Sequence, residues 1–135
     1  MTLVKSWAVA LAVLFAGSMV NAMLVIFGLA GDPGNLSGRA VYLYLPLLLT
    51  LFATTFAAGW VAREESGSVL RGVACYTVPG LAVVGGAVVT AGLGTTPIGE
   101  VLITLVIGGA GMFAGGLLSR TLHTRTRRRT DPAYY

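Results

Sequence analysis

Four long apolar segments, separated by short polar connectors, dominate the pattern of this chain. The apolar segments cover residues 6–30, 40–62, 69–93 and 98–119, and each is long enough to cross a bilayer, which takes about 20 residues of helix. Turn formers and charged residues fill the connectors. The pattern predicts an all-α membrane protein, with a single four-helix transmembrane domain over residues 1–119 and a basic tail over residues 120–135.

The first apolar segment has two interpretations. Lys5 precedes an apolar core, and Val20-Asn21-Ala22 matches a small-residue cleavage site, as in a secretory signal peptide. Strongly apolar sequence nevertheless continues past Ala22 to Ala30, so the whole segment has the length of a transmembrane helix. We favour a membrane span, and a cleaved signal over residues 1–22 is the alternative.

Small residues recur at helical spacing in the second and fourth segments. They are Thr50, Thr54, Ala58 and Ala62 in the second segment, and Gly108, Gly111, Gly115 and Ser119 in the fourth. In a soluble helix each interior glycine would be unfavourable by about 1 kcal/mol relative to alanine. In a membrane helix, small residues let two backbones approach closely. The two stripes therefore predict helix-packing surfaces.

The ends of these two segments also resemble each other. Residues 56–63 read FAAGWVAR and residues 113–120 read FAGGLLSR, which align without a gap. This internal sequence similarity predicts a parallel tandem repeat of two helical hairpins, related by an axis along the membrane normal.

Composition and charge place the chain in a membrane and orient it there. The sequence is 56% hydrophobic and 10% charged, whereas soluble domains are about 25% charged. With four spans, one side carries Lys5, Arg63, Arg71, Arg120, Arg125, Arg127, Arg128 and Arg129, and the other side carries Arg39 alone. The positive-inside rule then predicts a multi-pass protein of the cell membrane with both termini cytoplasmic.

The basic tail is a candidate contact for anionic lipid. Its arginines are Arg120, Arg125, Arg127, Arg128 and Arg129. Their place beside a membrane span favours a role in topology or lipid binding and argues against nucleic acid as a partner. We expect the tail to be mobile beyond the membrane surface.

The sequence contains no recognisable catalytic or metal-binding motif. Cys75 is the single cysteine, His123 is the single histidine, and Glu100 is the only carboxylate within a span. Glu100 is expected in the first turn of its helix, where the helix dipole favours a negative charge. We predict no enzymatic activity, no cofactor and no metal site.

Asn21, Thr50 and Thr54 are the candidates for a weakly polar path through the membrane. An amide in the middle of a span is expected to form a hydrogen bond to another helix, worth about 1 kcal/mol. A helix contact is therefore the favoured role of Asn21, and lining a substrate path is the alternative.

One stretch resembles a known type of protein. Residues 58–63, AGWVAR, are followed by a short polar turn and by Arg71-Gly72 at the start of the next helix. This arrangement resembles the central hairpin of uncharacterised small four-helix prokaryotic integral membrane proteins. The resemblance implies a fold and no activity.

Two functions remain open from the sequence. The first is a non-enzymatic protein that acts through helix packing, as an oligomer or as an accessory or assembly subunit of a membrane complex. The second is a small transporter or channel, with a path lined by Asn21 and membrane threonines.

Overall fold

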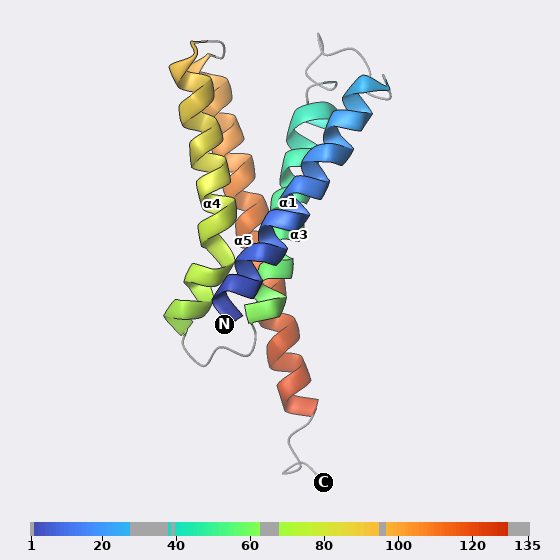
Figure 1. Ribbon diagram of the computed structural model, residues 1–135, viewed down its shortest axis with the longest axis vertical. Helices are drawn as coiled ribbons and strands as arrows, with labels where there is room; N and C mark the ends of the chain where they lie inside the picture. The colour runs from blue at the N-terminus through green and yellow to red at the C-terminus, as the bar shows by residue number, and fades with distance from the viewer. Residues whose placement is uncertain (1, 28–37, 39, 63–67, 95–96, 130–135) are drawn as a thin grey trace.

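The computed structural model describes residues 2–27, 38, 40–62, 68–94 and 97–129, and its elements there are all helices, which confirms the all-α part of the predicted fold class. The helices are α1 (Thr2–Ile26), the π-helix η1 (Ala40–Tyr44), α3 (Leu45–Val61), α4 (Ser68–Gly92) and α5 (Ile98–Arg129). Figure 1 shows them as two hairpins, α1 with α3 and α4 with α5. Whether the hairpins form a tandem repeat stays a prediction.

Three of these helices are long and apolar enough to cross a membrane. They cover Leu3–Ile26, Val69–Gly92 and Ile98–Leu122. The fourth, α3, has 17 residues, but η1 leads directly into it. Together η1 and α3 measure about 33 Å at 1.5 Å per residue, comparable with a hydrocarbon core about 30 Å thick.

Pro46 explains why a π-turn precedes α3. A proline ring inside a helix clashes with the carbonyl group four residues earlier and removes one hydrogen bond. Here Pro46 lies in the first turn of α3, directly after η1 ends at Tyr44. The wider π-turn opens the backbone where the ring needs room, so the helical path continues through the proline.

The two hairpins pack together over one half of their length and splay apart over the other. In Figure 1 the hairpins cross in the lower part of the view and separate toward the top. The N-terminus, the start of α4 and the end of α5 all lie at the lower end. We call the lower part the packed half and the upper part the open half.

The packed half is held mainly by α3 against α5. A Cβ atom at Gly111 would lie 2.8 Å from the Leu48 carbonyl oxygen, and one at Gly115 would lie 2.5 Å from the Phe52 carbonyl oxygen. Real Cβ atoms essentially never come so close to backbone. Only glycine therefore permits this distance between the two helices.

Ser6 joins three helices in the same half. Its side chain is completely buried, and its hydroxyl group lies 2.9 Å from the Ala58 carbonyl oxygen and 3.3 Å from the Ala74 carbonyl oxygen. Both carbonyl groups accept the Ser6 hydrogen in a shared arrangement. A small polar residue at this position therefore links α1 to α3 and α4, where lipid offers no alternative hydrogen-bond partner.

The helix α5 continues well past the predicted end of the fourth span. It runs to Arg129, so residues 120–129 are helical, which differs from the mobile tail expected from the sequence. No proline or glycine interrupts this stretch, and adding residues to an existing helix is far easier than starting a new one. The full 32-residue helix measures about 48 Å, so it projects beyond the other helices at the lower end (Figure 1).

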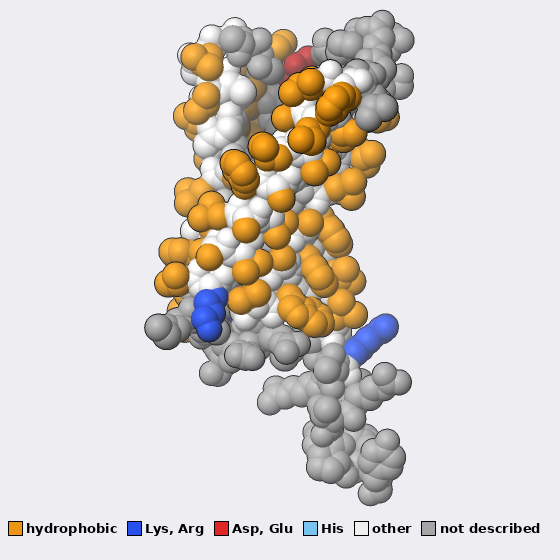
Figure 2. Space-filling view, turned by 45° about the vertical axis from the view of Figure 1, so that its right-hand side comes forward, with side chains coloured by type: hydrophobic (Ala, Val, Ile, Leu, Met, Phe, Trp, Pro, Cys, Tyr) orange, Lys and Arg blue, Asp and Glu red, His pale blue; other side chains and the backbone are white. Residues whose placement is uncertain are grey.

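Apolar side chains cover the outside of both hairpins. Phe15, Val106 and Phe113 are examples, with exposed fractions of 67%, 71% and 63%. In Figure 2 such side chains extend over most of the visible surface, and the basic side chains lie at the lower end. An exposed surface of this kind requires an apolar medium, so the protein is membrane-embedded and contacts lipid.

Candidate functional site

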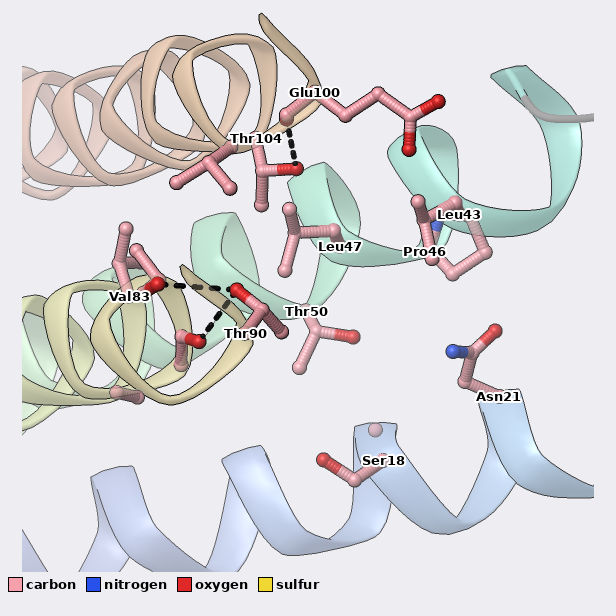
Figure 3. Close-up of a pocket in the computed structure, with 15 residues that line it drawn as sticks. Ser18, Asn21, Leu43, Pro46, Leu47, Thr50, Val83, Thr90, Glu100 and Thr104 are labelled. Atoms are coloured by element: carbon pink, nitrogen blue, oxygen red, sulfur yellow. Dashed lines mark hydrogen bonds between the residues drawn. The ribbon is translucent and has the colours of Figure 1, made fainter. Parts of the chain in front are cut away.

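A cavity of about 380 Å³ lies between the hairpins in the open half. All of the long helices and η1 contribute to its wall (Figure 3). The lining residues are Gly17, Ser18, Asn21, Leu43, Pro46, Leu47, Thr50, Ala82, Val83, Gly86, Ala87, Thr90, Glu100, Val101 and Thr104. We call this space the cleft. Its volume falls within the range typical of small-molecule sites, about 300–1,000 Å³.

The cleft reaches from the open end toward the middle of the molecule. Gly17 lies about 13 Å along the helix axis from the end of α1, and Thr104 lies about 9 Å from the start of α5. Half of a hydrocarbon core about 30 Å thick measures about 15 Å. The depth of the cleft is therefore comparable with the thickness of one leaflet.

Small residues keep the cleft open, and larger or closely packed ones close its base. Nothing lies within 4 Å of a Cβ atom built at Gly86, so this part of α4 leaves the space unfilled. Farther along, Leu51 is 2% exposed and contacts the Gly108 position from α3. At the side, a Cβ atom at Gly17 would lie 2.5 Å from the Thr50 side chain, so α1 and α3 meet there.

Three of the four hydroxyl groups in the wall, those of Ser18, Thr90 and Thr104, bond to their own helices. Ser18 donates to the Leu14 carbonyl oxygen at 2.8 Å, and Thr104 donates to the Glu100 carbonyl oxygen at 2.9 Å. The Thr90 hydroxyl lies 2.9 Å from the Gly86 carbonyl oxygen and 3.1 Å from that of Ala87. Each hydroxyl group has one hydrogen, so these oxygens can still accept hydrogen bonds but have no hydrogen left to donate.

Asn21 adds an acceptor without a partner. Figure 3 shows its amide group reaching from α1 into the space below Pro46. Its Oδ1 atom is buried and accepts no hydrogen bond from any residue that the structure describes. A buried polar atom in this condition is unfavourable by about 1–3 kcal/mol, and a bound donor would remove that penalty.

Glu100 brings a carboxylate to the mouth of the cleft. It lies in the first turn of α5, and Figure 3 shows its carboxyl group directed toward the start of α3, near Leu43 and Pro46. Figure 2 shows an acidic side chain at the upper end of the molecule. The helix dipole makes the first turn of a helix a favourable place for an acidic residue, so an acidic side chain lies at the opening of the cleft.

The structure brings together two of the three predicted path residues. Asn21 and Thr50 line the cleft, whereas Thr54 is completely buried and donates to the Thr50 carbonyl oxygen at 2.6 Å. Two further membrane threonines, Thr90 and Thr104, also line the cleft, whereas Glu100 was not assigned to a site from the sequence. The spacing of four residues between Glu100 and Thr104 on one helix face was the signal that could have grouped them.

Of the predicted packing residues, Thr50 lines the cleft, and the others lie outside it in the packed half. Thr54 and Ala58 lie on α3, Ala62 directly follows α3, and Gly108, Gly111, Gly115 and Ser119 lie on α5. All of the residues outside the cleft are buried. Gly59, next to this set, lies so close to α5 that an added Cβ atom would be 2.5 Å from the Ser119 Oγ atom. The glycine stripe of α5 therefore packs against other helices of the same chain.

The described basic side chains lie toward the end of the molecule opposite the cleft. Lys5, Arg120 and Arg125 are exposed there. Arg39 and Arg63 lie outside the described residues, as do the side chains of 127–129. Cys75, 4% exposed, lies in the packed half beside the Gly59 position. The described charges are thus divided between the two ends, with the carboxylate at one and the cations at the other.

The arrangement of the cleft supports binding. Among the described residues, no three or more histidine, cysteine, aspartate or glutamate side chains lie together as a metal site would require. The wall instead combines apolar side chains with a few polar groups, as small-molecule sites do. Comparison with models of protein families, with curated proteins and with solved structures finds no match for this chain.

Proposed function

We propose that this chain is a four-span protein of the cell membrane with both termini in the cytoplasm. Three helices of spanning length, together with the continuous stretch of η1 and α3, support four crossings. Lys5, Arg71 and Arg120 at one end support the orientation under the positive-inside rule. The cleft then opens toward the extracytoplasmic side.

We infer that the protein binds a small amphiphilic molecule in the cleft and has no enzymatic activity. The observation that carries this proposal is the cleft itself, whose wall is mostly apolar but contains Asn21, Thr50 and Glu100. An apolar ligand body fits the aliphatic wall, and a polar head fits the group of acceptors. The ligand enters from the leaflet or from the water at the open end.

Transport is the natural extension of binding in this geometry. The cleft is accessible from one end only, because Leu51, Thr54 and Thr55 close its base. Passage to the other side requires the hairpins to rock against each other, as the halves of many transporters do. This is the transporter alternative in a more specific form, with the cleft as the binding site of one of its two states.

A pair of neighbouring glycines provides the test. Gly86 lines the cleft, whereas Gly85 is exposed outside it, and neither has an atom within 4 Å of an added Cβ. Gly86→Trp should fill the cleft, and Gly85→Trp should leave it empty. The measurement is saturable binding of radiolabelled octylamine, octanol and octanoate to the protein in nanodiscs, corrected for uptake by empty nanodiscs.

The expected result is that at least one of these amphiphiles binds with a stoichiometry near one. That binding should disappear in Gly86→Trp and persist in Gly85→Trp. Absence of saturable binding for all three amphiphiles would refute the binding proposal, and equal binding by the two variants would place the ligand elsewhere.

Helix packing with another copy or another subunit is the second candidate function. The stripe of Gly108, Gly111 and Gly115 does not support it, since these residues pack within the chain, all three against α3 and Gly108 also against Val83 of α4. Gly85 and Gly109 do support it, because they are exposed and an added Cβ would meet nothing. Small residues on a lipid-facing surface allow another helix to approach closely. Crosslinking in native membranes should then detect a complex that Gly85→Leu disrupts.

Anionic lipid is the partner that we propose for the basic end. Arg120 and Arg125 are exposed on the part of α5 that projects beyond the bundle. Each basic residue near an anionic surface contributes about 1 kcal/mol. Native mass spectrometry should show acidic lipid retained by the parent chain and lost when the tail arginines are replaced by glutamine. Equal retention would remove this proposal.

A further inference from the structure

The cleft of the open half is rich in hydrogen-bond acceptors and poor in donors. Ser18, Thr90 and Thr104 have each given their only hydroxyl hydrogen to their own helix. The Asn21 Oδ1 atom accepts from none of the described residues. Among the lining side chains, only Thr50 and the Asn21 amide nitrogen can supply hydrogens in addition.

We propose that the cleft selects amphiphiles whose head group is a protonated amine. An ammonium group carries three N–H donors and no acceptor, which complements a wall of acceptors. The inference rests on the proposed binding function and names the chemistry of its ligand. The apolar part of such a molecule packs against Leu47, Val83 and Val101, which line the same space.

Other head groups complement this wall less well. A hydroxyl group has one hydrogen to donate and no charge, so it satisfies fewer acceptors. A carboxylate has no hydrogen to donate to these acceptors. A quaternary ammonium carries the charge but no N–H group. The difference in binding between it and a primary amine therefore measures the contribution of hydrogen bonding. Hydrogen bonds to charged groups are the stronger ones, and they are stronger still away from water.

The experiment compares four amphiphiles with the same octyl chain at neutral pH. The probes are octylamine, octyltrimethylammonium, octanol and octanoate, each measured as saturable binding to the full-length protein in nanodiscs. We expect octylamine to bind at least about tenfold more tightly than each of the others, a ratio that corresponds to about 1.4 kcal/mol. Equal or tighter binding of octanol, octanoate or the quaternary amine would overturn the selectivity.

Two substitutions test whether the wall is responsible. Asn21→Leu and Thr104→Val each remove an acceptor from the cleft and should each weaken octylamine binding by about 5-fold or more. Thr77→Val is the matched control, because the Thr77 hydroxyl donates to the Val73 carbonyl oxygen at 2.6 Å, also one turn back, but Thr77 does not line the cleft. It should leave binding unchanged. Circular dichroism and gel filtration confirm that each variant is folded.

The outcomes separate the two proposals. If no amphiphile binds saturably, the binding function fails and the amine selectivity fails with it. If octanol or octanoate binds as well as octylamine, and Gly86→Trp abolishes that binding, the binding function stands and only the amine selectivity is refuted. If octylamine is preferred but Asn21→Leu and Thr104→Val behave like Thr77→Val, the acceptor wall is not the cause and the inference is likewise refuted.

Discussion

The packed half and the open half use the same kinds of residue for opposite purposes. In the packed half, Gly115 brings α5 against the Phe52 carbonyl oxygen, and no side chain fits between them. In the open half, Gly86 faces empty space. A small residue thus creates contact where two helices converge and a cavity where they diverge, so its role depends on the crossing of the helices.

Serine shows the same contrast on one helix. Ser6 is completely buried and bonds to carbonyl groups of α3 and α4. Ser18 lies on the same helix but is exposed, and it bonds back to the Leu14 carbonyl oxygen. Ser6 donates its hydroxyl hydrogen to other helices, whereas Ser18 donates it within α1 and presents an acceptor to the cleft. The role of a serine in a membrane helix therefore depends on which groups surround it.

The largest effect is expected where backbones are closest. Gly115→Leu must push α5 away from α3, because the Phe52 carbonyl oxygen cannot move aside as a flexible side chain could. We expect a loss of about 3 kcal/mol or more, at the upper end of the range for overpacking. Thermal unfolding in mild detergent measures it. Gly109→Leu on the exposed side of the same helix is the control and should change little; similar losses in both would contradict the comparison.

A smaller loss is expected at the contact between Gly59 and Ser119. An alanine at Gly59 would place its Cβ 2.5 Å from the Ser119 Oγ atom and 2.9 Å from its Cβ atom. The overpacking should destabilise the fold by about 1–2 kcal/mol. Ser119→Gly removes both atoms and should restore part of the loss. A double-mutant cycle measures the coupling, and strictly additive effects would show that the two residues do not meet.

Removing the Ser6 hydroxyl group is expected to have a moderate effect. Ser6→Ala removes the hydrogen bonds that join α1 to α3 and α4. Interhelical hydrogen bonds in membranes contribute about 0.6 kcal/mol on average, with a maximum near 1.7, so we expect a loss of stability in this range. Ser18→Ala breaks only a bond within α1 and should have almost no effect on stability. Unfolding of both variants under the same conditions decides the point. If Ser18→Ala lowered the stability more than Ser6→Ala, the contrast between the two serines would be refuted.

The smallest effect on stability is expected from a cysteine placed in the cleft. Thr104→Cys should fold normally and react with a water-soluble maleimide added from the open end, because residue 104 lines an accessible space. Thr55→Cys, completely buried in the packed half, should resist the reagent. The parent chain sets the background, since Cys75 is only 4% exposed. Rapid labelling of Thr55→Cys would mean that the packed half opens.

The apolar segments predicted the helices well, because the length and hydropathy of a span are local properties. The boundaries moved by a few residues, except at the C-terminal end, where α5 continues to Arg129. The site was predicted only in part. Asn21 and Thr50 were singled out for their polarity, but polarity alone could not separate Thr50, which lines the cleft, from Thr54, one turn away and completely buried.

By itself, the order of residues determined that this protein is helical and lies in a membrane. Backbone groups in lipid must be satisfied within the segment, so long apolar runs have essentially one solution. Which small residues touch and which leave space was decided only by the tertiary structure. The angle between the hairpins brings Gly115 against backbone and leaves Gly86 open. That angle results from the contacts of all the helices at once, so no single segment encodes it.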